Sequence, residues 1–97
     1  MKQWTIGEPP DWSLIPNYMQ EGIVNYIEDG IPPGHFLTAI ICNDLMEACR
    51  RADSNNQRNL FNYAKFFYLY APSECYGSEK EMMAWVKHKG LKREVIG

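Results

Sequence analysis

Apolar residues recur every three or four positions along the first half of the chain, and this spacing predicts two amphipathic helices. The first apolar stripe consists of Ile15, Tyr18, Met19, Ile23, Tyr26 and Ile27. Pro16 suits a first helical position and Gly30 suits a helix end, so we expect a helix over 16–29. The second stripe consists of Phe36, Leu37, Ile40, Ile41, Leu45, Ala48 and Cys49. It predicts one continuous helix from His35 to Ala52.

Two more helices are expected in the second half of the chain. Asp53 or Ser54 can cap a helix over 55–70, whose segment LFNYAKFFYLY carries large apolar side chains on nearly every face. Such a helix either lies at the centre of a fold or forms half of an interface. Ser78, followed three residues later by Glu81, is a capping box that starts the last helix. The apolar side of that helix consists of Met82, Trp85 and Val86.

Together these elements predict an all-α fold, a compact bundle of about four short helices. We expect one domain over 1–97, with a helical core at 14–91 and a tail at 92–97. Residues 1–13 alternate weakly around Trp4 before two prolines, which favours an extended arm. A short strand pair between this arm and the tail is an alternative that the pattern leaves open.

The net charge of −2 follows from ten Lys and Arg against twelve Asp and Glu. That balance is too mild for a DNA mimic and has the wrong sign for a nucleic-acid binder, so direct nucleic-acid binding is not expected. Residues 1–30 are nevertheless acidic and residues 87–97 basic. Because a chain of 97 residues has a thin stability margin, we expect these ends and the aromatic helix to support a homo-oligomer.

The chain shows no sign of a membrane segment or a leader. No apolar run approaches the roughly 18 residues that cross a bilayer. No basic region followed by an apolar stretch opens the sequence. We therefore expect a cytoplasmic protein without membrane contact.

Candidate catalytic and metal-binding residues fail on their spacing. His35, Cys42 and Cys49 recur every seven positions, which puts neighbours about 10 Å apart on a helix, too far to share a zinc ion or form a disulfide. Cys75 and His88 offer a nucleophile and a base but no third group to orient them. The sequence has no P-loop, Rossmann glycine fingerprint, nucleophile elbow or HExxH pattern. We therefore expect no catalytic residue, no metal site and no cofactor, and a protein that acts by binding.

Asn43 and Asp44 stand in the middle of the second expected helix, where both residue types are unfavourable. One interpretation is structural: an exposed helix face with weak ion pairs, or side chains that fix the neighbouring IPPG loop. The other is a binding site, in which Gly34 admits a ligand to backbone amides and arginines supply charge for a phosphate. Asn43 and Asp44 would then contact a base or ribose. The residues expected in that site are Pro33, Gly34, His35, Asn43, Asp44, Arg50 and Arg51.

The stretch YIEDGIPPGHFLTAIICNDLMEACRRAD, followed by APSECYGS and a Trp-bearing last helix, resembles a group of small bacteriophage and prophage proteins. The likeness runs from Leu14 to Leu91, and it implies an origin without implying any activity. From that origin we expect a non-enzymatic counter-defence protein that sequesters a nucleotide-derived signalling molecule. The alternatives are an anti-CRISPR-like inhibitor that binds a host defence protein, and an accessory protein of virion assembly or replication.

Overall fold

The computed structural model describes Trp4 and residues 9–91. Within these residues the chain forms helices and turns and no strand, so the expected all-α fold is confirmed. The α-helices are α1 (Asn17–Asp29), α2 (His35–Ile41), α3 (Leu45–Arg51), α4 (Ser54–Arg58), α5 (Leu60–Tyr70) and α6 (Glu79–Lys87), with 3-10 turns η1 (Trp12–Leu14) and η2 (Ser73–Cys75). The strand pair expected between the termini involves residues 92–97 and most of 1–8, which lie outside the described residues.

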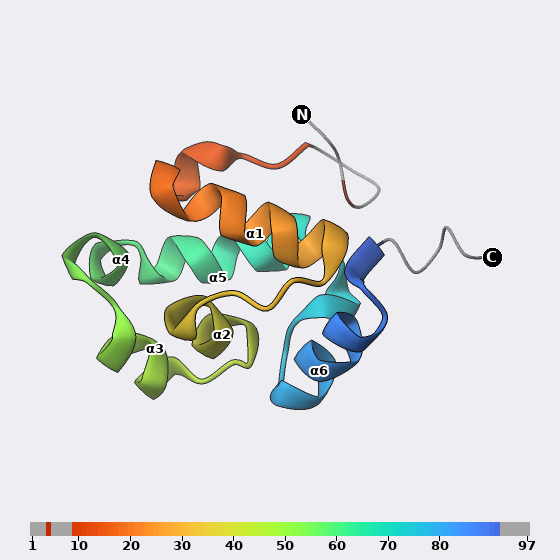
Figure 1. Cartoon of the computed structure of the whole chain (residues 1–97). Coiled ribbons are helices and arrows are strands. Elements are labelled where there is room, and N and C mark those ends of the chain that lie inside the picture. Colours follow the sequence, from red (N-terminus) through yellow and green to blue (C-terminus); the bar gives the residue numbers. More distant parts are fainter. Residues whose placement is uncertain (1–3, 5–8, 92–97) are drawn as a thin grey trace.

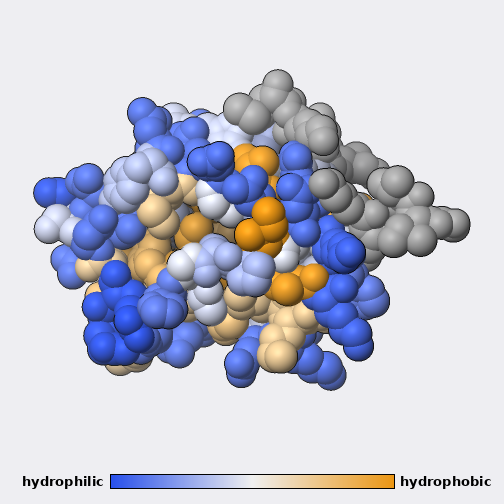
Figure 2. All heavy atoms as spheres, in the orientation of Figure 1, coloured by the Kyte–Doolittle hydropathy of each residue, from blue (hydrophilic) through white to orange (hydrophobic). Residues whose placement is uncertain are grey.

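The helices surround one hydrophobic core. In Figure 1, α1 and α5 run across the upper half of the molecule, α2 and α3 lie below them, and α6 lies toward the C-terminal end. On the face shown in Figure 2, hydrophobic residues gather across the middle and hydrophilic ones surround them. The largest fully buried side chains are Trp85, Tyr26, Tyr63, Phe66, Ile23, Ile27, Ile41 and Cys75. The aromatic helix α5 therefore contributes directly to the core, which is one of the two roles expected for it.

The prediction of a single helix over 35–52 is wrong, because the chain forms α2 and α3 with a turn between them. Asn43 in this turn has a φ of 63°, a left-handed conformation that follows the end of α2 and that Asn tolerates better than most residues. Asp44 then caps α3, since its carboxylate accepts a hydrogen bond from the backbone N–H of Glu47 at 3.2 Å. Asn43 and Asp44 are therefore a helix stop and a helix start.

The other helix boundaries follow local capping signals. As expected, α1 ends at Gly30, whose φ of 71° is left-handed. Ser78 caps α6 as expected, because its side-chain oxygen accepts the backbone N–H of Glu81 at 3.4 Å, and the Ser78 hydroxyl donates to the carboxylate of Glu81. The helix expected over 55–70 is interrupted at Asn59, which gives α4, capped by Asp53, and α5. Two interruptions thus account for six α-helices in the described part of the chain where about four were expected.

Tyr26 ties α1 to two later segments of the chain. Its side chain is fully buried, and its hydroxyl donates a hydrogen bond to the carbonyl of Cys75 in η2 at 2.6 Å. Its own carbonyl accepts a hydrogen bond from the indole N–H of Trp85 in α6 at 3.0 Å. A buried polar group left without a partner costs about 1–3 kcal/mol, so these two bonds fix how η2 and α6 sit against α1.

Two tryptophans of the expected arm pack against the helical core. The ring centroids of Trp12 and Phe66 lie 4.8 Å apart, and those of Trp4 and Trp12 lie 5.6 Å apart, edge to face. The indole N–H of Trp4 donates a hydrogen bond to the carboxylate of Glu28 at 3.0 Å. The arm expected to be extended therefore includes the 3-10 turn η1 and is held to α1 and α5 by its aromatic side chains.

Gly30 and Gly90 meet backbone to backbone, just beyond the ends of α1 and α6. A Cβ atom on Gly30 would lie 2.6 Å from the backbone nitrogen of Gly90, and one on Gly90 would lie 2.7 Å from the carbonyl oxygen of Ile27. Both glycines also have a positive φ. Because neither position has room for a side chain, this approach of α1 to the end of α6 requires glycine.

We expect Gly30→Ala to destabilise the fold, because the new Cβ would clash with Gly90 and a left-handed conformation costs about 1–2 kcal/mol for a residue with a side chain. The free energy of unfolding, measured by urea denaturation, should fall by at least that amount. Gly34→Ala is the matched control, since a Cβ there has open space and the φ is −69°. Equal stability of the two variants would contradict the packing of Gly30 against Gly90.

Candidate functional site

The loop that contributes Pro33 and Gly34 to the predicted site lies between α1 and α2. Gly34 is the N-cap residue of α2, and the hydroxyl of Thr38 donates a hydrogen bond to the carbonyl of Pro33 at 3.4 Å. A Cβ atom on Gly34 would meet nothing within 4 Å, so glycine is not sterically required there. Gly34 therefore lies in the open, and the expectation that it admits a ligand to backbone amides stays a prediction.

A polar cavity of about 360 Å³ brings three of the predicted site residues together. His35, Asp44 and Arg51 line it from the start of α2, the turn before α3 and the end of α3. Its other lining residues are Thr38, Ala39, Cys42, Glu47 and Glu79. Asn43 and Arg50 are not among them. Three of the predicted site residues therefore lie together in the structure. Glu79 from α6 lies with them, although no local sequence pattern connects it with α3.

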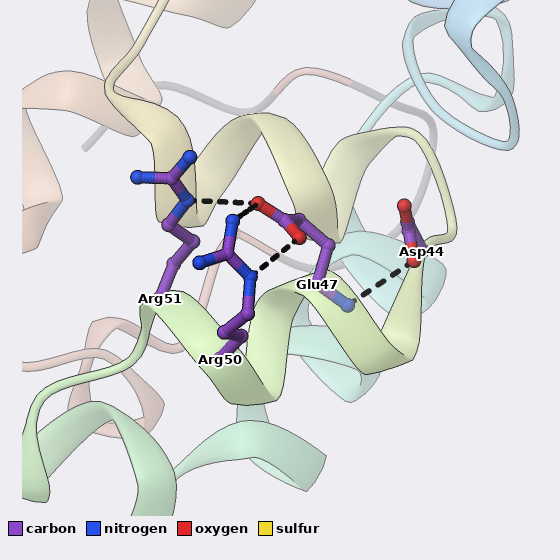
Figure 3. A network of polar contacts seen from close by, with 4 residues as sticks. All are labelled: Asp44, Glu47, Arg50 and Arg51. Atoms are coloured by element: carbon purple, nitrogen blue, oxygen red, sulfur yellow. Dashed lines mark hydrogen bonds and ion pairs between the residues drawn. The ribbon is translucent and has the colours of Figure 1, made fainter.

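Glu47 holds both arginines of α3, as Figure 3 shows. Its carboxylate accepts hydrogen bonds from Nε and Nη2 of Arg50 at 3.1 and 2.8 Å, and from Nε of Arg51 at 2.8 Å. The contacts with Arg50 and Arg51 lower the pKa of Glu47 from its ordinary value of 4.5 to about 2. A phosphate group would therefore have to compete with Glu47 for both arginines.

Carboxylates give the polar cavity an acidic character. Its lining includes Asp44, Glu47 and Glu79 against one arginine, Arg51. Burial raises the pKa of the Cys42 thiol, and the negative charges of Glu79 and Asp44 raise it further. Asp44, Glu47 and Glu79 against Arg50 and Arg51 leave a net charge of −1 (2 − 3) at the cavity, which favours a cation there over an anion.

Burial affects the reactivity of two of the three cysteines, Cys42 and Cys75. All three are free, and Cys75 is fully buried. Burial raises the pKa of the Cys75 thiol to about 12, so a thiolate nucleophile does not form there near neutral pH. Among the described residues, no group of three His, Cys, Asp or Glu side chains is arranged to hold a metal ion.

A second cavity, the apolar groove, lies between α5 and the α2–α3 pair and has a volume of about 240 Å³. Its lining residues are Ala39, Ile40, Asn43, Asp44, Leu45, Ala48, Leu60, Ala64, Phe67, Tyr76 and Gly77. Alanines on three different helices line it: Ala39 and Ala48 are buried, and Ala64 is exposed. Ala39 and Asp44 also line the polar cavity, so the two cavities adjoin.

Large apolar side chains stand exposed on α5 and α3, two of the helices that line the apolar groove. Phe61 and Tyr68 on α5 are each 76% exposed and lie three and four residues from Ala64, so they share its side of the helix. Leu45, which lines the groove from α3, is 64% exposed. The sequence marked α5 as unusually aromatic, but its periodicity did not separate these exposed rings from the buried ones, and the groove was missed.

The α2–turn–α3 unit has the connectivity of a helix–turn–helix. In DNA-binding versions, the start of the second helix enters the major groove and meets phosphates nearby. Here Asp44 and Glu47 stand at that start, and the two arginines further along are paired with Glu47. This unit therefore presents acidic side chains where DNA binding requires basic ones.

No protein-family model matches this chain, and no curated protein or solved structure matches it either. The resemblance to small bacteriophage and prophage proteins therefore stays a prediction. Among the described residues, the structure contains no helix with the length and apolar character needed to span a membrane.

The ion pairs of Glu47 predict a specific acid sensitivity. Because the pKa of Glu47 is lowered from 4.5 to about 2 in the folded state, its contribution to stability is present above pH 4.5 and is lost as the pH falls toward 2. Glu47→Gln should remove this part of the pH dependence, measured as the urea midpoint against pH. Glu21→Gln, an exposed carboxylate on α1, is the control. A Glu47→Gln profile that parallels the unaltered chain across this range would show that the pairs contribute nothing in solution.

Proposed function

We propose that this chain is a non-enzymatic binding protein whose partner is another protein, held at the apolar groove. The groove itself is the main support: an apolar hollow of about 240 Å³, with exposed aromatic side chains on α5, a helix that lines it. An apolar cavity of about 150 Å³ is enough to take up a benzene ring, so the groove has room for one large side chain of a partner. Such an anchor in a pocket is the usual energetic centre of a protein–protein interface.

The exposed side chains around the groove enlarge the contact surface. An aromatic side chain buries roughly 150–250 Å² when it is covered, so Phe61 and Tyr68, each 76% exposed, offer a few hundred Å². Together with Leu45 at the groove, this area is comparable to the roughly 300–600 Å² of the largest apolar patch on a typical monomer, and such patches often mark binding sites. Covering these side chains would be favourable, because apolar surface would leave water.

A nucleotide-derived ligand, the partner expected from the sequence, is the less favoured candidate. Its phosphates would need Arg50 and Arg51, and Glu47 already holds both. Asp44 and Glu79 would in addition repel an anion that entered the polar cavity. The arrangement of charges therefore favours a protein partner.

We include a role in counter-defence, which is expected from the sequence, in this proposal. Three roles are expected from a phage origin, and two of them, an inhibitor of a host defence protein and an accessory of virion assembly or replication, act through a protein surface. The apolar groove supports these two ahead of a sponge for nucleotide signals. We favour the inhibitor, the alternative already drawn from the sequence.

The substitution Ala64→Arg tests this proposal, because it places a long charged side chain in the groove. A partner captured from host cells by the tagged, unaltered chain should be lost from the variant. Binding of the purified partner, measured by calorimetry, should weaken by about 30-fold or more, as expected when an anchor worth about 2 kcal/mol is excluded.

Ala84→Arg is the matched control, since Ala84 is an exposed alanine on α6. It should keep both the partner and the melting temperature. Undiminished partner binding by Ala64→Arg would refute the proposal, as would a melting temperature raised by cyclic nucleotides with no protein captured. The expected homo-oligomer stays a prediction. If sedimentation shows a dimer of the unaltered chain and a monomer of Ala64→Arg, the groove would bind a second copy of this chain instead.

A further inference from the structure

We propose that the groove receives an amphipathic helix of the partner, which inserts an apolar side chain into the apolar groove and a Lys or Arg into the adjoining polar cavity. This inference rests on the proposed function and adds the chemistry of the bound segment. Three features of the described residues carry it: the continuity of the two cavities, the sign of the charge in one of them, and the apolar walls of the other.

The two cavities form one continuous surface. Ala39 and Asp44 line both of them, and Asp44 stands at the turn where α2 ends and α3 begins. On one side of Asp44 the lining is mostly apolar, with Leu45 and Ala64. On the other it is polar, with Glu79. One binding segment can therefore contact an apolar hollow and an acidic hollow at once.

The sign of the charge selects a basic side chain. Glu47 is committed to Arg50 and Arg51, which leaves Asp44 and Glu79 as the carboxylates without an arginine partner among the described contacts of the cavity. After burial, the charges of Glu79 and Asp44 are the causes that raise the pKa of the Cys42 thiol in the same cavity. A Lys or Arg of the partner would be attracted to the same field, and its long apolar stem could lie along the cavity wall.

The walls of the apolar groove favour a helix over an extended peptide. An extended segment would bring unpaired backbone N–H and C=O groups against Leu60, Phe67 and neighbouring apolar side chains, and each unpaired group is costly to bury. The described residues include no strand edge that could pair with them. A helix satisfies its own backbone and presents anchors every three or four residues, as in other helix-in-groove complexes.

The test uses two fluorescently labelled synthetic peptides that share one amphipathic apolar face of Leu and Phe. Lys and Arg flank that face in the first peptide, and Glu flanks it in the second. Fluorescence anisotropy with the full chain should show the basic peptide binding at least tenfold more tightly at low salt. The ratio should shrink as salt is added, because partly exposed charges are screened.

A double variant, Asp44→Asn with Glu79→Gln, should abolish this preference without loss of folding, because Asn caps a helix as well as Asp does. Its affinity for the acidic peptide should rise toward that for the basic one. The matched control is Asp11→Asn with Glu21→Gln, which makes the same change of charge and also replaces a capping Asp, at η1. The control should keep the tenfold preference.

The outcomes separate this inference from the proposed function. Equal binding of the two peptides, or a preference that survives the double variant, overturns the inference while groove binding stands. Binding of neither peptide, with a natural partner still lost in Ala64→Arg, also overturns the inference alone. If Ala64→Arg binds the peptides as well as the unaltered chain does, the inference and the proposed function are both overturned. Both are also overturned if the chain binds duplex DNA or a cyclic dinucleotide tightly and Arg51→Ala abolishes that binding.

Discussion

The buried hydroxyl and carbonyl of Tyr26 hold three parts of the chain in one arrangement. The hydroxyl is bound to the carbonyl of Cys75 and the carbonyl to the indole of Trp85, so α1 is tied to η2 and α6. Burial raises the pKa of the Tyr26 hydroxyl, which keeps it a neutral donor. The segment directly after η2 supplies Tyr76 and Gly77 to one end of the apolar groove. The placement of that end therefore depends on a bond made in the core.

The break between α2 and α3 shapes the rest of the groove. The left-handed Asn43 and the capping Asp44 turn the chain, so that Ala39 and Ala48, from two different helices, line the same hollow. The backbone N–H of Gly77 donates to the carbonyl of Ile41 at 2.8 Å, which satisfies one acceptor that the end of α2 leaves free. The unusual Asn-Asp pair thus has a structural role, and its consequence for binding is indirect.

How much the sequence could predict depends on how local each signal is. Gly30 and Ser78 mark helix ends through their own backbone and side-chain chemistry, so α1 and α6 were placed closely. The end of α2 before Asn43 could not be predicted, because apolar residues continue at helical spacing on both sides of the turn. The pairing of Glu47 with the arginines follows from spacing on one helix. The polar cavity needs Glu79 from α6, and such a contact between distant segments leaves no periodic trace.

The isolated fold carries a cost at the apolar groove that packing alone does not explain. A larger apolar side chain at Ala64, which is exposed and lines the hollow, would fill part of it and add buried area, yet this position holds alanine. Phe61 and Tyr68 meanwhile stand in water. In a chain of 97 residues the stability margin is thin, and unfilled space and exposed rings both lower it. Proteins retain such local costs mainly at functional sites, and a partner that fills the hollow and covers the rings would recover the free energy that the fold alone gives up.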